Sequence, residues 1–348
     1  MAGTINPFKL LRTVLLQGES KKHIFVVITA FVLLMCISGV SIAKDMPPDN
    51  SCRTLRCMAR VYISCGEYTK ALPLAKEALD LAETNEEVSD SELSSCLIDL
   101  AWVYKSQMQF EKAQQACERG LELQKKAYYE NHPYVAYTLR TLSSIYQGQG
   151  RYQKARDSLN QAMVIMLENH SADDQVIAPF KVDIAKLLVA EGNFPEAEAY
   201  YLSALDLINK SYGPDHLYTA GVNGYLAKLY VLQGKYRKAE PLIKQTLAVQ
   251  EKIYGPNHHL IAPTWLTMAR IYQAKGNYAK AETLYNQALA TLEKAFAPEH
   301  CRVADVLDAQ VQLYKEIGNV TKAAQAKKRA EQIRALNQTK HTLIAKAG

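Results

Sequence analysis

Apolar positions along this chain recur with two superimposed periods. Over short distances they follow the three- and four-residue spacing of one helical face, as in residues 260–275 and again in 278–292. Over longer distances the same helical pattern returns every 42 residues. Gly213 and Gly255 lie in two copies of a Y-G-P-[DN]-H segment, each followed by the same apolar columns. Such fixed self-similarity indicates a repeat architecture, in which neighbouring copies bury one another's apolar faces.

Three columns extend this register to seven copies between residues 52 and 336. An unbroken alanine column consists of Ala71, Ala113, Ala155, Ala197, Ala239, Ala281 and Ala323. A glycine column consists of Gly66, Gly150, Gly192, Gly234, Gly276 and Gly318, with Met108 filling its gap. A tyrosine column upstream holds Tyr62, Tyr104, Tyr146, Tyr230, Tyr272 and Tyr314, with Leu188 in the remaining place. Glycine adopts the left-handed conformation that ends many helices, so each copy is predicted to be two helices around a glycine turn. The fold class is therefore all-α, with fourteen antiparallel helices and essentially no strand.

One copy carries a known pattern. Its residues are Trp265-x2-Met268-Ala269-x2-Tyr272 followed by Ala281-x3-Tyr285. They resemble the tetratricopeptide pattern W-x2-L-G-x2-Y…A-x3-F, and the longer period with its Y-G-P-[DN]-H junction resembles the repeats of kinesin light chains. The resemblance implies a right-handed α-solenoid of about seven helix-turn-helix repeats. It also implies protein or peptide binding, without naming the partner.

In the resembled family, the first helix of each repeat lines a concave groove. The column expected to face the groove here holds Arg60, Trp102, Ser144, Lys186, Lys228, Arg270 and Gln312, and an adjacent column adds Arg56 and Arg140. Acidic side chains or a terminal carboxylate of a peptide would pair with such a row of cations. We therefore expect partner binding by Arg56, Arg60, Trp102, Arg140, Lys186, Lys228 and Arg270. A solvated helix face is the alternative interpretation of these columns.

The N-terminal residues predict a membrane segment. Residues 24–43 contain no charged side chain and, as a helix, match the thickness of a bilayer core. Four basic residues precede this stretch against Glu19 alone, which favours a cytoplasmic N-terminus. The predicted organisation is a cytoplasmic segment 1–23, a transmembrane anchor 24–43, a linker 44–51, extracytoplasmic repeats 52–336 (periplasmic in a bacterium) and a basic tail 337–348. A secreted protein is the alternative, because Ser41-Ile42-Ala43 resembles a signal-peptide cleavage site.

Charge changes this picture little. The formal net charge is +6, and it is concentrated in the first 43 and the last 27 residues, so the repeats between are slightly acidic. A basic end can contact anionic lipid or nucleic acid. We favour a solvated last helix, and the predicted topology argues further against nucleic acid as a partner.

The cysteines and histidines are the residues whose side chains could bind a metal or react. None of the seven cysteines forms a C-x-x-C pair, and Cys117 falls in a core column, so small apolar helix residues are the favoured interpretation. A disulfide among Cys52, Cys57, Cys65, Cys96 and Cys117 stays open in an oxidising compartment. Four histidines recur in register: His132, His216, His258 and His300. Stacked repeats hold equivalent residues about 8–10 Å apart or more, too far for one zinc ion, so these histidines are interpreted as junction residues at helix starts.

The remaining functional prediction is a binding surface. The sequence has no recognised nucleophile, phosphate-binding or metal-binding motif, so we expect no enzyme activity, no cofactor, no metal and no small-molecule substrate. The predicted function is a membrane-anchored scaffold that binds a partner segment, possibly an acidic one, in the concave groove. The alternative is a structural assembly factor that acts through repeat edges and loops without a peptide groove.

Overall fold

The computed structural model describes residues 52–64, 68–296 and 298–347, and in this part of the chain every regular element is a helix. The described residues form fourteen α-helices, as predicted, and two short 3-10 helices. The first helices of the seven repeats are α3 (Cys52–Ser64), α5 (Asp90–Ser106), α7 (Pro133–Gly148), α9 (Ala178–Ala190), α11 (Leu217–Leu232), α13 (Ala262–Ala274) and α15 (Cys301–Glu316). The second helices are α4 (Tyr68–Thr84), α6 (Phe110–Ala127), α8 (Tyr152–Asn169), α10 (Phe194–Tyr212), α12 (Tyr236–Tyr254), α14 (Tyr278–Phe296) and α16 (Val320–Ala347).

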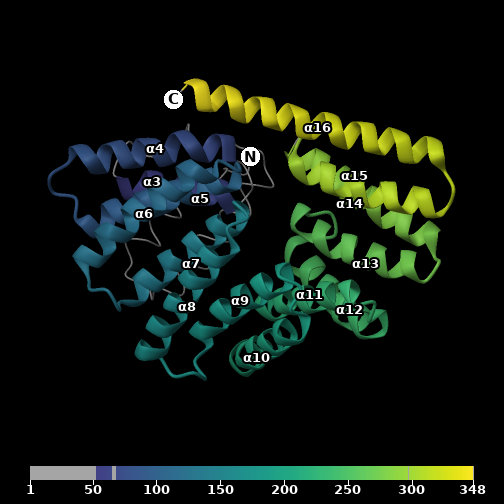
Figure 1. Ribbon diagram of the computed structural model, residues 1–348, viewed down its shortest axis with the longest axis horizontal. Helices are drawn as coiled ribbons and strands as arrows, with labels where there is room; N and C mark the ends of the chain where they lie inside the picture. The colour runs from purple at the N-terminus through teal and green to yellow at the C-terminus, as the bar shows by residue number, and fades with distance from the viewer. Residues whose placement is uncertain (1–51, 65–67, 297, 348) are drawn as a thin grey trace, which may run out of the picture.

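The repeats stack in chain order into a curved array. Each first helix packs on the second helix of its own repeat, and each second helix packs on the first helix of the next repeat. Figure 1 shows the resulting arch, which runs from α3–α6 through α9 and α10 to α14–α16. The last helix, α16, is the longest and extends along the open side of the arch (Figure 1). It continues to Ala347, through the stretch that the sequence suggested as a tail.

The alanine column allows this close packing. Ala155, Ala197, Ala239 and Ala281 are completely buried, because a methyl group is the largest side chain that fits where two helix backbones approach. Larger side chains fill the spaces between repeats, among them Phe180, which is also fully buried. The core is therefore a band along the array, with no single centre.

The glycine column provides the turns inside the repeats. Gly150, Gly192, Gly234, Gly276 and Gly318 all have positive φ angles between 72° and 80°. Met108 occupies the same column and takes φ 60°, the one positive φ of a non-glycine residue in the described chain. L-residues pay about 1–2 kcal/mol for this conformation, so the turn geometry is imposed by the packed helices on either side.

The junctions between repeats confirm the role predicted for the recurring histidines. Nδ1 of His132 accepts a hydrogen bond from the backbone N–H of Tyr134, at 3.1 Å, and so caps α7. Equivalent caps are made by the other members of the column, His216, His258 and His300. Each of these rings also stacks on an aromatic residue four positions earlier, as Tyr212 does on His216. At the junction before α9, Asp174 stands in the histidine column and caps the 3-10 helix η2 (Gln175–Ile177), and at the junction before α5 the capping residue is Ser89.

One first helix begins differently from the sequence-based expectation. A continuous helix was expected over 260–275, but the chain makes a 3-10 turn, η3 (His259–Ile261), before α13 starts. Pro263 lies in the first turn of α13, where its missing N–H has no intrahelical partner to lose. α9 follows η2 in the same way, again with a proline in its first turn.

The predicted membrane segment, residues 24–43, lies outside the described residues. Within the described ranges, no helix combines the length and the apolar character needed to cross a bilayer.

Candidate functional site

A pocket of about 550 Å³ opens on the first helices at the N-terminal end of the array. We call it the N-terminal pocket. Its walls come mainly from α3, α5 and α7, with Gln124 and Tyr128 at the end of α6. The cations in its lining are Arg56, Arg60 and Arg140. Because successive first helices line it, the pocket lies on the surface where the resemblance placed a groove.

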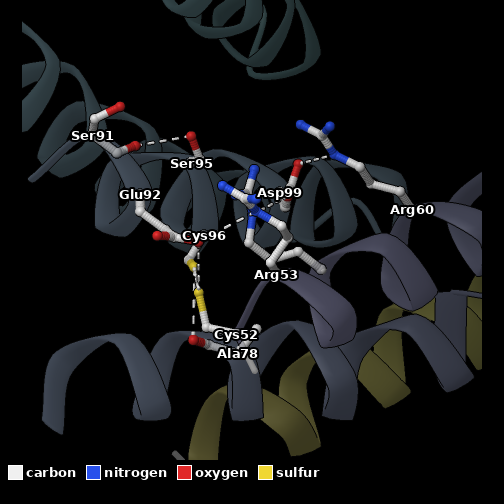
Figure 2. A network of polar contacts seen from close by, with 10 residues as sticks. Cys52, Arg53, Arg60, Ala78, Ser91, Glu92, Ser95, Cys96 and Asp99 are labelled. Carbon is white, nitrogen blue, oxygen red and sulfur yellow. Dashed lines mark hydrogen bonds and ion pairs between the residues drawn. The ribbon is translucent and has the colours of Figure 1, made fainter. Parts of the chain in front are cut away.

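Two of these arginines share one buried carboxylate. Asp99, on α5, is 4% exposed, and its two oxygens accept hydrogen bonds from Nε of Arg56 at 2.9 Å and Nε of Arg60 at 2.8 Å. Figure 2 shows Arg60 reaching across from α3 to Asp99. Arg56 is itself largely buried, whereas Arg60 is 61% exposed. Asp99 thus fixes Arg60 by one nitrogen while leaving most of its guanidinium open to solvent and to a ligand.

The same arrangement returns two repeats later. Arg140 forms a hydrogen-bonded ion pair with Asp183, on α9, and the two are 43 positions apart, as are Arg56 and Asp99. Asp183 also accepts a hydrogen bond from Nζ of Lys186 at 3.0 Å. Nζ of Lys186 in turn lies 4.3 Å from the centre of the Tyr225 ring. Each carboxylate therefore holds two cations, which leaves excess positive charge around both.

The charges around Asp183 determine its ionisation. Burial acts to raise the pKa of this carboxyl group, but the nearby Arg140 and Lys186 outweigh burial and hold the pKa below its ordinary value. Lys186 responds in the opposite sense. Burial acts to lower its pKa, yet the charge of Asp183 prevails and the pKa is raised. The ion pair is therefore fully formed at neutral pH.

Lys105 is the least well neutralised cation in this region. It lies on α5, donates a hydrogen bond to Ser144 Oγ at 2.9 Å and places Nζ 3.9 Å from the centre of the Trp102 ring. Burial lowers its pKa to about 8; the attraction of Asp183 opposes this shift, whereas Lys186 and Arg140 add to it. An anionic ligand nearby would favour the charged form of this lysine.

Aromatic rings complete the N-terminal pocket. Trp102, Tyr128, Tyr134 and Tyr137 all line it, and each is exposed to solvent. Exposed aromatic side chains beside arginines are the composition found at energetically important positions of protein interfaces. The pocket can thus offer ionic contacts and apolar contact area to the same ligand.

A second cavity, of about 670 Å³, lies on α11, α13 and α15; we call it the C-terminal pocket. Its cations are Lys228, Arg270 and Arg302, and its lining also includes Asp305 and Asp308. Lys228 and Arg270 are exposed. Two carboxylates within the lining itself make this pocket nearly balanced in charge.

The repeat pattern has a known counterpart. The sequence profile described as tetratricopeptide repeat matches residues 50–126, 104–168, 177–252, 218–294 and 260–335. The chain belongs to the tetratricopeptide repeat family. Comparison with curated protein sequences finds no match.

Solved structures similar to this tetratricopeptide repeat chain include complexes of Rap proteins, one of them with a peptide. The Rap conjugation gene regulator of the plasmid pLS20, in complex with the Phr* peptide, has a TM-score of 0.70 at 13% identity, over 96% of this chain and 90% of that chain. A Rap protein complexed with Competence and Sporulation Factor has a TM-score of 0.68 at 15% identity, over 96% and 97% of the two chains. At these identities the likeness shows the fold alone.

Kinesin-light-chain repeats are also among the similar structures, as the junction motif suggested. The TPR-like repeats of a putative kinesin light chain from Podosopora anserina are 25% identical and cover 60% of this chain and 98% of that chain, with a TM-score of 0.47.

The tetratricopeptide groove brings the predicted site residues into two groups. Arg56, Arg60, Trp102 and Arg140 line the N-terminal pocket, and Lys228 and Arg270 line the C-terminal pocket. Lys186 lines neither pocket and is paired with Asp183. Whether any of these residues binds a partner stays a prediction.

Sequence reasoning missed the acidic half of the site. Asp99 and Asp183 stand in one column of the 42-residue register, each 43 positions after an arginine of the neighbouring column. This paired recurrence is visible in the sequence and could have indicated that Arg56 and Arg140 are internally neutralised. Lys105 has no comparable sequence signal, because its properties arise from burial beside other cations.

The described residues contain no group of three or more His, Cys, Asp or Glu side chains arranged to hold a metal ion. The four predicted junction histidines act as caps at the starts of four different repeats.

Proposed function

We propose that the solenoid is a protein-binding scaffold whose N-terminal pocket binds an acidic, aromatic- or apolar-containing segment of a partner protein. The observation that supports this most directly is the charge of the pocket lining. Arg56, Arg60 and Arg140 line the N-terminal pocket and no carboxylate of the described residues does, whereas Asp305 and Asp308 stand in the lining of the C-terminal pocket. The complex of a structurally similar Rap regulator with the Phr* peptide is compatible with this function.

The ligand of this pocket is an extended segment with at least one carboxylate. The exposed part of the Arg60 guanidinium can donate further hydrogen bonds to such a group, since its Nε alone is bonded to Asp99. Trp102 and the tyrosines beside it would cover the neighbouring apolar side chains of the segment. The exposed part of the Arg60 guanidinium and the exposed aromatic rings would thus contact the same segment.

The proposal is tested with a defined peptide and the full chain. The probe is a fluorescein-labelled decapeptide in which Asp and Glu alternate with Leu and Phe, and the matched probe replaces the acids with Lys. We expect the acidic peptide to bind, and the Kd to rise about tenfold or more in Arg60→Gln and in Trp102→Ala. Affinity should also fall as salt is raised, because the attraction is screened.

Arg270→Gln is the matched control, since it removes the same kind of side chain from the C-terminal pocket. It should change the Kd less than threefold or so, as expected for a cation distant from the bound segment. Equal binding of the acidic and basic peptides would contradict the proposal. If Arg60→Gln and Trp102→Ala both bind the acidic peptide as well as the parent protein does, the binding surface lies on loops or repeat edges, as in the assembly-factor alternative.

We further propose that residues 24–43 anchor the protein in a membrane, with the repeats on the extracytoplasmic side. The proposal is supported by the uncharged stretch and by the basic residues before it. Sequencing the N-terminus of the mature protein distinguishes a retained membrane anchor from a cleaved signal peptide. An intact N-terminus in the membrane fraction supports the anchor, whereas a mature chain beginning at Lys44 identifies a cleaved signal peptide.

A further inference from the structure

Two thiols face each other at the start of the described array. Cys52 is the first residue of α3 and Cys96 lies in the middle of α5, and their Sγ atoms are 3.7 Å apart (Figure 2). Cys52 is 7% exposed and Cys96 is 1% exposed. A disulfide requires an S–S distance of about 2.0 Å, so the two sulfurs have to approach by less than 2 Å or so.

The contacts around the two thiols are weak and leave them free to approach. The Sγ of Cys52 also lies 3.6 Å from a carboxylate oxygen of Glu92, and the Sγ of Cys96 lies 3.7 Å from the backbone oxygen of Ala78. These distances are long, and a thiol is a weak hydrogen-bond donor. Neither thiol therefore donates a strong hydrogen bond that would be lost when the disulfide forms.

The other described cysteines are placed differently. Cys57 is exposed, Cys117 lies against the backbone oxygen of Thr138, and Cys301 lies beside His300. Among the described cysteines, Cys52 and Cys96 are thus the pair whose sulfur atoms contact each other.

We propose that Cys52 and Cys96 form a disulfide under oxidising conditions, and that this bond locks α3 onto α5. The inference goes beyond peptide binding, although the bond would border the N-terminal pocket. Arg56 is one helical turn after Cys52, and Asp99 is one turn after Cys96, so the bond would lie in the same α3–α5 seam as their ion pair. α3 packs against α4 and α5 and is the first helix of the described array, so a covalent link there restrains the end of the solenoid.

The reaction needs an oxidant, and glutathione disulfide is the oxidant in the proposed reaction. The thiolate of Cys52 attacks one sulfur of glutathione disulfide, which forms a protein–glutathione mixed disulfide and releases one glutathione thiolate. The thiolate of Cys96 then attacks the Cys52 sulfur, forms the Cys52–Cys96 bond and releases the second glutathione thiolate. The two protons lost by the protein thiols are taken up by the two glutathione thiolates. Two electrons pass from the protein to the oxidant.

Burial makes this reaction depend on opening of the terminal helix. It raises the pKa of Cys52 and, together with the proximity of Cys52, raises the pKa of Cys96 to about 12. At neutral pH the closed state therefore contains little thiolate, and the attack occurs when α3 separates from α5 or during folding.

The test compares the full-length parent protein in oxidising and reducing glutathione buffers. Free thiols are blocked with an alkylating reagent in denaturant, and linked peptides are mapped by mass spectrometry. We expect a peptide linking Cys52 to Cys96 in the oxidised sample and none after reduction. Hydrogen–deuterium exchange of the α3 amides should be at least about tenfold slower in the oxidised sample, because the link restricts opening.

Cys57→Ser is the matched control on the same helix, and it should leave the link and the protection of α3 unchanged. Cys52→Ser and Cys52→Ala should each remove the oxidation-dependent protection. The comparison of oxidised and reduced parent protein remains decisive even if a Cys52 variant fails to fold. Fully alkylated Cys52 and Cys96 after oxidation, a link to a different cysteine, or a mapped link without protection of α3 would each overturn the proposal.

Discussion

Arg60 in the N-terminal pocket and Lys228 and Arg270 in the C-terminal pocket occupy one column of the repeat, but the two pockets hold their cations in different ways. In the N-terminal pocket Arg56 and Arg60 converge on Asp99, which is almost completely buried. In the C-terminal pocket Lys228 and Arg270 are exposed, and the acids in the lining come from α15. The difference shows that basic residues at equivalent positions of the repeats can differ in their ion pairs and in how strongly they are held. Whether a buried carboxylate lies within reach, as Asp99 does for Arg60, decides whether a cation is fixed within the structure.

Fixed cations suit recognition better than mobile ones. A cation already held by a buried carboxylate has lost much of its side-chain entropy before a ligand arrives, so binding costs less. The exposed lysine in the C-terminal pocket keeps that entropy in the free protein. The N-terminal pocket is therefore the stronger candidate for specific binding, and the following tests probe the difference between the pockets.

The largest expected effect is on stability when a shared carboxylate is removed. Asp183→Ala leaves Arg140 and Lys186 without their acid in a partly buried environment, and we expect the free energy of unfolding to fall by about 2–3 kcal/mol. Urea denaturation followed by circular dichroism measures this change. The matched variant is Asp308→Ala, whose partner Arg334 is 46% exposed, and it should cost less than about 1 kcal/mol. Equal costs for the two variants would remove the distinction between the pockets.

The pH dependence of stability sharpens the same contrast. The pKa of Asp183 is lowered in the folded protein, so its contribution is fully present above the unfolded pKa of about 4 and is lost as pH falls through the lower folded pKa. The stability difference between the parent and Asp183→Asn should therefore be constant near neutral pH and shrink below about pH 4. Denaturation curves of both proteins across this range measure it. A difference that is unchanged at acid pH would show that the ion pair contributes nothing.

A smaller effect is expected on the affinity for the acidic peptide. Lys105 has a pKa lowered to about 8, so it is mostly charged below this pH and mostly neutral above it. Affinity should therefore fall several-fold, and at most about tenfold, as pH rises from 7 to 9. In Lys105→Arg the charge persists, so the affinity should vary less over this range. A parent protein whose affinity does not change between these pH values would place the bound carboxylate away from Lys105.

The smallest effect concerns the turns between the two helices of a repeat. Met108 has φ 60° where the other described repeats have glycine, so Met108→Gly should relieve strain and raise the free energy of unfolding by up to about 1 kcal/mol. The matched change in the C-terminal half is Gly276→Ala, at φ 73°. No atom lies within 4 Å of the added Cβ, so backbone strain alone should cost about 1 kcal/mol. Thermal melts of the two variants measure both changes, and effects of the same sign would contradict this account of the column.

The sequence by itself determined the repeat unit and its helices. The 42-residue register identified the buried alanines, such as Ala281, and the turn glycines, such as Gly276, because close helix contact and a left-handed turn each admit few side chains. The recurring histidines were likewise placed correctly at helix starts, since a junction repeats with the unit. Local and nearest-neighbour interactions dominate a solenoid, so a periodic sequence determines them well.

Only the tertiary structure decided which of the periodic side chains meet. Lys186 and Lys228 occupy one column, yet Lys186 pairs with Asp183 and Lys228 remains exposed in a pocket. Cys52 and Cys96 are 44 positions apart, and Arg56 and Asp99 are 43 apart, so neither pair shares a column of the register. Their contacts depend on how far one first helix is shifted and rotated against the next. That offset is set by the packing of all the side chains between the helices.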